Sequence, residues 1–369
     1  MKVCVVKERA GGERRVALTP DATSKIIAKG LEVYVESGAG AGAFLADDAY
    51  RAAGATVVAD AGTLLAQADL LLKVQSPTPD ETSRLREGAA VISSLPVAGS
   101  EEIVRALAGR RVTAFSMERM PRTTRAQAMD TLSSQATIAG YKAVLLAATA
   151  FGRMFPMLMT PAGTLAPTKV FVIGAGVAGL QAIATARRLG ATVSAFDVRP
   201  AVKEQVQSLG ASFVQVELAD RETEDAGGYA KELSEESHRR EQELLARTLR
   251  QVDVVITTAL IPGKPAPRLI TEAMVREMRA GSVVVDLAAA AGGNCELTEP
   301  GREVVKHDVT IIGTLNLPAT VPVHASQMFA RNVTALLFEM LKDGALHIDF
   351  GNEIVAATCV THAGEIRVT

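Results

Sequence analysis

The strongest chemical signal in the sequence is a set of three glycines, Gly174, Gly176 and Gly179, which follows the apolar run KVFVI at residues 169–173 and opens a helical pattern. In this spacing the first glycine permits a tight turn, the second lets the backbone approach a diphosphate, and the third lets the helix pack closely on the strand. The N–H groups at the start of the helix then favour the phosphates. Asp197 ends the next expected strand, 18 residues after Gly179, where a carboxylate binds an adenosine ribose. The pattern predicts a dinucleotide site.

A lone glycine cluster is a weak signal, because turns use glycine freely. The strand before this cluster, the helix after it and the acid that follows favour dinucleotide binding over a structural glycine turn. Asp197 would repel a 2′-phosphate and therefore favours NAD over NADP. Arg199 lies two residues further on and is the counter-argument, and we interpret it as a surface residue.

Three more loops of the same half follow expected strands, at the edge where such sheets bind ligands. They are Ala259–Pro267, which its prolines make rigid, Asp286–Asn294, and the charge-rich segment Glu217–Glu243. In the last one, Tyr229 follows two glycines. The segment could form a lid that closes over a cofactor, or it is a plain surface loop, and the sequence leaves both open.

A second candidate is the polar stretch PRTTRAQAMDTLSSQATIAGY at residues 121–141. A plain connector would end after about five residues. This one carries two arginines, two glutamines, an aspartate and a row of hydroxyls. Such groups hold a polar ligand, or they form a hydrophilic helix N-terminus in which Asp130 is a first-turn acid. The length and the number of hydrogen-bonding groups favour a ligand.

Composition limits the classes of function. The 369 residues are 48% hydrophobic and 22% charged, as in globular proteins, and the length favours two domains. A net charge of −2 and 4% aromatic residues without tryptophan argue against a nucleic-acid partner. Cys4, Cys295 and Cys359 match neither a disulfide framework nor a metal site, so we expect packing roles in a reducing cytoplasm and no metal. The sequence shows no signal-peptide core and no apolar run of roughly 20 residues that would span a membrane.

The elements that must position these residues follow one rhythm twice. Short apolar runs alternate with helical patterns, which is typical of a doubly wound parallel sheet with buried strands. We therefore expect an α/β protein with two Rossmann-like, doubly wound parallel-sheet domains. The expected strands are Val3–Val6, Leu31–Val35, Thr56–Val58, Leu70–Val74, Ala89–Ile92 and Val112–Phe115 in the first domain, and Lys169–Ile173, Thr192–Phe196, Asp253–Thr257, Ser282–Asp286 and Thr310–Ile312 in the second.

Two long helical stretches, roughly residues 129–153 and 323–341, are expected to join the domains and to return the C-terminus to the first one. The expected N-terminal domain is discontinuous, and its two segments flank the nucleotide-binding domain. Its segments are residues 1–127 and 315–369, and the nucleotide-binding domain is residues 128–314.

Two further segments carry local predictions. The apolar run Ile138–Met159 contains Lys142 and Arg153, so we interpret it as a buried helix that ends near Pro156. The tail ALHIDFGNEIVAATCV has Gly351-Asn352 between two apolar segments, which predicts a hairpin.

Motifs along nearly the whole chain resemble the alanine dehydrogenase and pyridine nucleotide transhydrogenase family. They are KERAGGERRVALTP (7–20), LLLKVQSP (70–77), the glycine loop through DVR (169–199), TTALIPGKPAP (257–267), VVDLAAAAGGN (284–294) and NLP (316–318). In the dehydrogenase branch an Arg and a Lys hold the oxoacid carboxylate, while a His and an Asp handle protons. This sequence keeps the two cations, Arg15 and Lys73. It has Leu95 at the matching histidine position, and Ala289 and Ala290 where a second acid would follow.

The missing proton groups point to the transhydrogenase branch. Reductive amination must deliver protons to oxygen and nitrogen. Hydride transfer between two nicotinamide rings moves carbon to carbon, and needs the rings about 3–3.5 Å apart with water excluded. In that branch the polar stretch resembles the loop that contacts the nicotinamide end of the cofactor. The implied contacts, here called the nicotinamide set, are Arg122, Gln127, Asp130 and Ser133.

The residue types in the nicotinamide set suit that role. Gln127 and Ser133 offer the donors and acceptors that a carboxamide needs, and Asp130 offers an acceptor for ribose hydroxyls. Arg122 could orient the carboxamide or face a partner's nucleotide. The expected active site is the cleft between the two domains. With the glycine pattern, the resemblance implies cofactor contacts at Gly174, Gly176, Val177, Ala178, Gly179, Asp197, Val198, Arg199, Gly228, Tyr229, Ala259, Leu260 and Asn316.

The resemblance also implies partners, because the sequence holds a single glycine pattern followed by a suitable acid. NAD(H) would bind this chain, and NADP(H) would bind a partner domain or beta subunit. The family's component is a homodimer beside a membrane-spanning proton-channel subunit. It lies on the cytoplasmic face, attached peripherally to the inner (plasma) membrane, and hydride transfer there is coupled to proton translocation. Two alternatives stay open: an amino-acid dehydrogenase with other proton donors, and a non-catalytic NAD-binding module.

Overall fold

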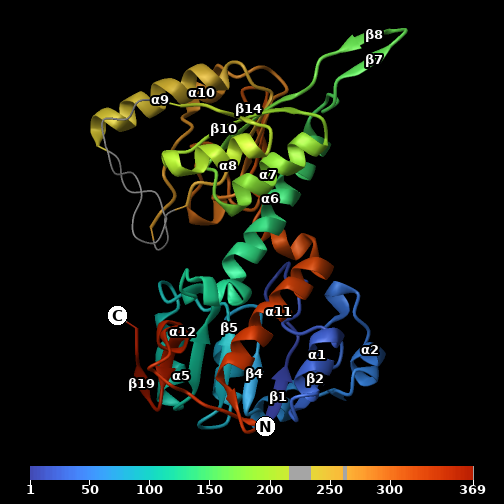
Figure 1. Cartoon of the computed structure of the whole chain (residues 1–369), viewed down its shortest axis with the longest axis vertical. Coiled ribbons are helices and arrows are strands. Elements are labelled where there is room, and N and C mark those ends of the chain that lie inside the picture. Colours follow the sequence, from blue (N-terminus) through green and yellow to red (C-terminus); the bar gives the residue numbers. More distant parts are fainter. Residues whose placement is uncertain (216–233, 261–263, 369) are drawn as a thin grey trace. The chain divides into compact units, whose positions relative to one another are not determined.

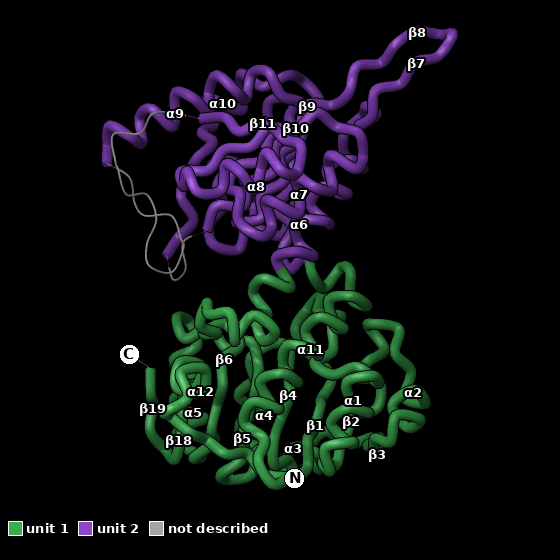
Figure 2. Tube along the Cα trace, viewed as in Figure 1, with its two compact units in different colours: residues 1–135, 318–369 green, residues 136–317 purple. Residues whose placement is uncertain are grey.

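The computed structural model describes residues 1–215, 234–260 and 264–368. The chain forms two compact units, shown in two colours in Figure 2. Unit 1 comprises Met1–Gln135 and Pro318–Thr369, and unit 2 comprises Ala136–Leu317. The expected boundaries at 127/128 and 314/315 lie eight and three residues before these divisions. The chain therefore leaves unit 1 within a helix and returns to it for its last segment.

Unit 1 contains an eight-stranded sheet in the order β19-β18-β6-β5-β4-β1-β2-β3. The strands from β1 to β6 pair in parallel, as the sequence predicts. The order turns back between β1 and β4, so the loops after these two strands leave the same edge of the sheet in opposite directions. The strands are β1 Lys2–Val5, β2 Glu32–Glu36, β3 Thr56–Val58, β4 Leu70–Leu72, β5 Ala90–Ser93, β6 Thr113–Ser116, β18 Cys359–His362 and β19 Glu365–Ile366.

The two faces of this sheet carry separate apolar cores, because alternate residues of a buried strand point to opposite sides. Val3 and Val5 belong to one core, together with Phe329 of the long helix α11. Cys4 belongs to the other, with Leu107 of α5. The helices are α1 Pro20–Ile27, α2 Asp47–Ala52, α3 Ala61–Gln67, α4 Pro79–Arg84, α5 Glu101–Gly109, α11 Pro322–Met340 and α12 Glu353–Thr358. Both sides of the sheet are thus covered, as the parallel pairing requires.

The C-terminal tail is not the hairpin that the sequence predicts. Asn352 accepts a hydrogen bond from the Ile354 N–H and caps α12. The chain then enters β18, which pairs antiparallel with β6; both strands are labelled in Figure 2. A short apolar run of this kind is ambiguous, because a buried helix turn and a strand have similar compositions over about six residues. Asn352, a residue type that caps helices, is the local signal for a helix start.

Unit 2 contains a seven-stranded sheet in the order β11-β10-β9-β12-β13-β15-β14, parallel except for β14. Its strands are β9 Lys169–Ile173, β10 Thr192–Phe196, β11 Ser212–Phe213, β12 Val254–Thr257, β13 Val283–Asp286, β14 Glu303–Lys306 and β15 Val309–Ile312. Val170 and Val172 of β9 face the core under α7 (Val177–Arg188), and Phe171 faces the core under α9 (Glu235–Leu249). Each strand that the sequence predicts is present in the two sheets to within two residues.

The long helices differ from expectation in extent. Helix α6, Thr131–Ala150, contains the division between the units, whereas α11 lies wholly in unit 1. The expected helix to Pro156 is also too long, because α6 ends at Ala150. A hairpin follows, formed by β7 (Leu158–Thr160) and β8 (Gly163–Leu165), and Figure 1 shows it extending from the rest of its unit.

The cysteines are buried in the cores, as their spacing in the sequence predicts. All three cysteines are free and buried, and burial raises the pKa of the Cys4 thiol to about 12 and that of the Cys295 thiol to about 11. Protonated thiols of this kind pack as small apolar groups. Within the described ranges, no helix is long and apolar enough to cross a membrane.

Candidate functional site

The glycine turn of unit 2 has the geometry that its sequence predicts. Gly174 directly follows β9 and has φ +95°, a conformation that favours glycine. A Cβ on Gly179 would lie 1.9 Å from the Gly174 carbonyl oxygen, so helix and strand pack backbone to backbone there. At Gly176, the N-terminal cap of α7, a Cβ would meet nothing within 4 Å. The turn is therefore closed toward the sheet and open on the side where a diphosphate would approach.

This geometry fits a dinucleotide. The open side of Gly176 lies at the start of α7, a helix of 12 residues whose first N–H groups point out of the helix. Val177 at that start is 42% exposed, although it is apolar. Thr258 donates a hydrogen bond from its hydroxyl to the Gly174 carbonyl at 2.9 Å and so braces the turn from the neighbouring strand end.

The acid of the pattern is present and already bonded. Asp197 follows β10 and accepts hydrogen bonds from the Ala175 N–H at 2.7 Å and from the Arg199 N–H at 2.9 Å. The Arg199 guanidinium adds two more, to Oδ1 at 2.9 Å and to Oδ2 at 2.8 Å. The prediction that Arg199 is a surface residue is wrong, because its side chain is 15% exposed and is held by Asp197.

The loop after β12 is held in place by an amide that was not among the expected contacts. Asn294 is fully buried, and its side chain donates to the carbonyls of Ala259 and Pro267 and accepts from the Ala259 N–H. These three bonds fix Ala259 and Pro267, the two ends of the loop, at the carboxyl edge of the sheet. Next to Ala259, Leu260 is 48% exposed. The motif DLAAAAGGN gave the signal, since a polar residue ends an otherwise small and apolar run.

Asp286, the acid that ends β13, is a structural residue. It is 1% exposed, and its two carboxylate oxygens accept four hydrogen bonds, from the Thr257 and Thr298 hydroxyls and from the Ala288 and Cys295 N–H groups. A carboxylate with about four acceptor sites is saturated by these donors. Asp286 therefore fixes the loop that carries Ala289 and Ala290.

The other expected cofactor contacts differ in exposure, and two of them are not described. Gly228 and Tyr229 lie outside the described residues, as does the segment interpreted as a lid or surface loop up to residue 233. The last residues of that segment are described and belong to the start of α9. Asn316 follows the sheet with φ 49° and is exposed. Val198 is partly buried between Asp197 and Arg199.

In unit 1 the polar stretch forms an unusual local structure. Residues Thr124–Met129 form a 3₁₀ helix, η3, longer than the three or four residues at which such helices normally stop. Asp130 then accepts bonds from the Ser133 N–H at 2.9 Å and from its hydroxyl, which caps the start of α6. Two members of the nicotinamide set, Asp130 and Ser133, are thus brought together, while Arg122 and Gln127 are exposed. Asp130 therefore has the role of an acid at the start of a helix. That role does not account for the exposed polar side chains of Arg122 and Gln127.

Residues that are distant in sequence hold this stretch. Asn332 of α11 donates to the Ala128 carbonyl at 2.8 Å and accepts from the Ser134 hydroxyl at 2.7 Å. Gln135 donates to the Ala325 carbonyl and accepts from the Arg15 guanidinium at 3.0 Å. Nothing in the sequence indicated Asn332, because its partners lie about 200 residues away.

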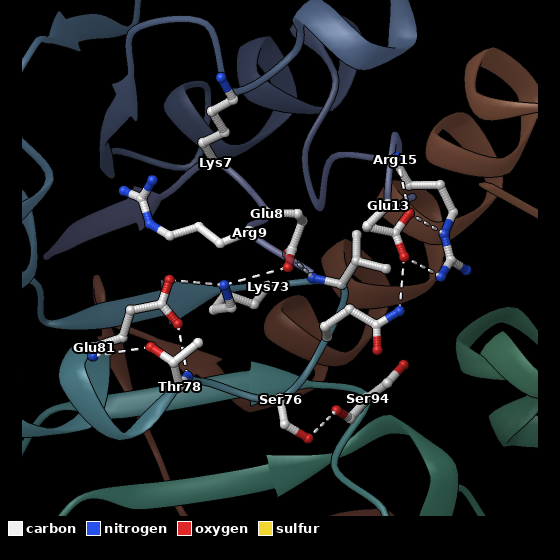
Figure 3. Close-up of polar contacts among 12 residues, drawn as sticks. Lys7, Glu8, Arg9, Glu13, Arg15, Lys73, Ser76, Thr78, Glu81 and Ser94 are labelled. Atoms are coloured by element: carbon white, nitrogen blue, oxygen red, sulfur yellow. Dashed lines mark hydrogen bonds and ion pairs between the residues drawn. The ribbon is translucent and has the colours of Figure 1, made fainter. Parts of the chain in front are cut away.

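The two cations expected from the family resemblance lie in buried ionic networks of unit 1, shown in Figure 3. Lys73 is 1% exposed and lies 3.0 Å from Glu81 and 3.3 Å from Glu8. Arg15 is held by both oxygens of Glu13, at 2.9 Å through Nε and at 2.6 Å through Nη2. The structure therefore places both cations against carboxylates of the same chain.

The charge balance of this network is unusual. Two buried glutamates, Glu8 and Glu81, share the single ammonium of Lys73. Glu81 is also committed to a capping box, accepting from the Thr78 N–H at the start of α4. Burial raises the pKa of the Glu8 carboxyl above its ordinary value, and the nearby Lys73 lowers it only in part. Glu8 Oε1 accepts from the Val74 N–H at 2.6 Å, which ties the loop after β1 to the end of β4.

The position that the resemblance matches to a histidine is apolar in the structure. Leu95 follows β5, is fully buried in the core shared with Leu71 and Val91, and its carbonyl accepts from the Ser116 hydroxyl. Ala289 is buried and Ala290 is exposed on the loop after β13. These positions carry no group that could hold or move a proton.

Comparison with known proteins agrees with the motifs. The family model described as "Alanine dehydrogenase/PNT, N-terminal domain" matches residues 4–139, and "Alanine dehydrogenase/PNT, C-terminal domain" matches residues 143–369. The chain is 51% identical over 374 aligned residues to the first part of the NAD(P) transhydrogenase subunit alpha of Rhodospirillum rubrum, covering 99% of this chain and 97% of the relative. It is 30% identical to "Alanine dehydrogenase" of Mycobacterium tuberculosis, covering 99% and 94%. The crystal structure of transhydrogenase from Sinorhizobium meliloti superposes with a TM-score of 0.87 at 45% identity, covering 99% and 98%.

Proposed function

The chain belongs to the alanine dehydrogenase/PNT family, and from this premise we propose that it is the NAD(H)-binding subunit of a proton-translocating NAD(P) transhydrogenase. In this proposal the chain binds NADH and gives its hydride directly to NADP⁺ held by a partner domain. The observation that carries the proposal is the combination of an open glycine turn with apolar residues at the proton positions. The higher identity to the transhydrogenase relative than to the dehydrogenase relative supports it.

The glycine turn supplies binding and orientation. Gly176 gives the diphosphate access to the start of α7, and Thr258 and Asn294 brace the turn and the adjoining loop. A bound NAD(H) supplies the hydride chemistry, since its nicotinamide carries and releases the hydride. The chain's own residues hold the cofactor, orient its ring and exclude water.

The proton groups of a dehydrogenase have no counterpart at the matching positions. Leu95 is apolar, Ala289 and Ala290 carry no titratable group, and Asp286 is saturated by four structural hydrogen bonds. Reductive amination needs groups with tuned pKa values to deliver protons. Carbon-to-carbon hydride transfer does not, so this set of residues favours the transhydrogenase reaction.

The nicotinamide end is assigned, by the same proposal, to the nicotinamide set. Gln127 and Arg122 are exposed, and Asp130 with Ser133 forms a short polar unit at the start of α6. Asp130 would accept from ribose hydroxyls, and Gln127 and Ser133 would bond the carboxamide. Gly228, Tyr229, Val198 and Asn316 complete the proposed contacts.

The proposed transhydrogenase contains other chains. A relative named as a piece of a subunit implies an assembly, and the proposed partners are a second copy of this chain, an NADP(H)-binding beta subunit and a membrane-spanning proton-channel subunit. The proposed location is the cytoplasmic face of the inner (plasma) membrane, to which these partners attach the chain. Transfer between two nucleotides needs a second nucleotide site, which the partner domain would provide.

The alternative with a specific observation behind it is an amino-acid dehydrogenase, because Arg15 and Lys73 are both present and held in place. One assay separates the candidate functions: oxidation of NADH by an NADP⁺ analogue, with and without an NADP(H)-binding partner domain, followed by pyruvate and ammonia alone. We expect transfer only with the partner. NADH consumption with pyruvate and ammonia alone would establish the dehydrogenase, and NADH binding with neither reaction would leave a non-catalytic binding module.

A further inference from the structure

The carboxylate of Asp197, which is expected to bind the adenosine ribose, already accepts four hydrogen bonds from its own chain. Asp197 Oδ1 accepts from the N–H and the Nε–H of Arg199, and Oδ2 accepts from the Ala175 N–H and from Nη2 of Arg199. All four contacts are 2.7–2.9 Å long, and the side chain of Asp197 is only 5% exposed. An ionised carboxylate offers about four acceptor sites, so each oxygen already has its two donors.

The acceptor sites that a ribose needs are those that the guanidinium fills. The two backbone donors, from Ala175 and Arg199, belong to the turn and to the strand end and would stay when a ligand binds. The other two donors, Nε and Nη2, come from one side chain. If that side chain moves away, each carboxylate oxygen gains one free acceptor site. A ribose with hydroxyls on two adjacent carbons brings two donors to those two sites.

We propose that the Arg199 guanidinium competes with the adenosine ribose for Asp197, so that nucleotide binding must displace it. Arg199 is in this sense a residue that sets nucleotide affinity, and the inference rests on the proposed NAD(H) function of the same site. A bidentate pair between Arg and a carboxylate is among the stronger ionic contacts, and the ribose must replace it. The displaced guanidinium stays cationic and solvated at the carboxyl edge of the sheet.

The charges around Asp197 include a second acid. Glu241 of α9 is a second buried acid in the same region, with a pKa raised first by burial and further by the charge of Asp197. Its Oε2 lies 3.1 Å from Nδ1 of the half-exposed His238. Removing the charge of Arg199 therefore leaves two acids less well compensated. A variant that keeps the charge but loses the planar fork, Arg199→Lys, separates occupancy of the carboxylate from the loss of charge.

The experiment measures dissociation constants by titration calorimetry for NADH, for ADP and for 2′,3′-dideoxy-ADP, which lacks both ribose hydroxyls. The chains are the unmodified protein, Arg199→Met, Arg199→Lys and the control Arg188→Met, which removes an exposed Arg near the far end of α7. We expect R199M to bind NADH and ADP roughly tenfold more tightly, a change that corresponds to about 1.4 kcal/mol. R199K should show a smaller gain, because one ammonium bonds the two oxygens less completely. The dideoxy compound should bind all four chains equally, and R188M should match the unmodified protein.

Each other outcome has a defined meaning. Weaker NADH and ADP binding in both R199M and R199K would overturn the inference, since Arg199 would then hold the nucleotide rather than exclude it. An equal gain for ADP and its dideoxy analogue would also overturn it, because the effect would be electrostatic and not specific to the ribose. If R199M does not fold, judged by its thermal unfolding, R199K alone decides by the same criteria. Failure of every chain, the unmodified one included, to bind NADH would overturn the proposed function together with this inference.

Discussion

The two units place different chemistry at the same point of a similar sheet. In unit 1, β1 lies between β2 and β4, and in unit 2, β9 lies between β10 and β12. In both, the residue two places after the strand donates its N–H to an acid at the end of the neighbouring strand: Lys7 to Glu36, and Ala175 to Asp197. In both, an Arg also pairs with that acid. The acid alone therefore does not identify a nucleotide site.

The difference lies in the loop between strand and helix. Unit 2 uses three glycines, with the backbone packed at Gly179 and open at Gly176. Unit 1 uses a longer charged loop, KERAGGERR, whose Glu8 reaches the buried Lys73. One loop leaves backbone groups available to a ligand, and the other is filled by side chains of its own chain. The glycines, and not the acid, therefore distinguish the proposed nucleotide site from its counterpart in unit 1.

The largest effect is expected from removal of the buried cation of unit 1. Lys73→Met leaves Glu8 and Glu81 without their shared partner, and breaking a buried ion pair in this way costs about 3–5 kcal/mol in the free energy of unfolding. Urea unfolding followed by circular dichroism measures it. The control is Lys25→Met, whose exposed pair with Asp21 is worth less than about 1 kcal/mol. A loss for K73M no greater than that of K25M would show that side-chain charges do not hold this loop.

The next effect concerns the contribution of unit 1 to the reaction. If Gln127 positions the nicotinamide, Gln127→Ala should slow hydride transfer about 100-fold, because a small misplacement of reacting groups has that consequence. The dissociation constant of NADH should change far less. Rapid-mixing kinetics and calorimetry measure the two quantities, with the exposed Gln207→Ala of unit 2 as control. Equal losses in rate and affinity would remove Gln127 from the proposed site.

Gly176 tests the binding side of the comparison. A Cβ there meets nothing within 4 Å, so Gly176→Val should fold normally and yet weaken NADH binding at least tenfold, or about 1.4 kcal/mol, by blocking the approach of the diphosphate. Gly179→Val should instead unfold unit 2, since its Cβ would lie 1.9 Å from a backbone oxygen. Gly109→Ala at the end of α5, with open space around its Cβ, is the neutral control. Unchanged NADH affinity in G176V would place the nucleotide elsewhere.

The sequence predicts the fold and the unit 2 site for a shared physical reason. A parallel strand, a glycine turn, a helix and an acid lie within about 30 residues, so local spacing carries the geometry. The polar stretch of unit 1 is different, because residues distant in sequence hold it. Asn332 donates to the Ala128 carbonyl and Arg15 donates to Gln135, and the residues of each pair are 120 or more apart. No local pattern reports such contacts.

The errors have local physical causes. The tail is a capped helix followed by an antiparallel strand. A short, mostly apolar run fits either form, and the local signal for the helix is its capping residue Asn352. The sequence predicts Arg199 on the surface, because residue spacing does not encode the backbone turn that pairs its side chain with Asp197. The helix expected to reach Pro156 ends at Ala150, and the end of the same apolar run forms β7, the first strand of an exposed hairpin.

The smallest effect is a pH dependence in unit 1. Burial raises the pKa of Glu8 in the folded state, so the folded chain binds a proton more tightly than the unfolded chain. Stability then falls as the pH rises from the ordinary carboxyl pKa of 4.5 through the raised folded value. Glu8→Gln removes this proton linkage and keeps an acceptor for the Val74 N–H. Relative to the unmodified protein, E8Q should gain stability as the pH rises above 4.5, and a difference that is constant with pH would contradict the assignment.

The proposed reaction passes hydride directly from one nicotinamide to another, and the positions of Leu95, Ala289 and Ala290 carry no proton-transfer group. Its most direct test follows the label in the reaction of NADH that carries deuterium at both C4 positions with NADP⁺ on the partner domain, in ordinary water. The converse experiment uses unlabelled NADH in D₂O. We expect that one deuterium of the labelled NADH appears in NADPH, and that none enters from D₂O. Label lost to water, or deuterium gained from it, would mean that a proton-exchanging group takes part, and would contradict the interpretation of Leu95, Ala289 and Ala290.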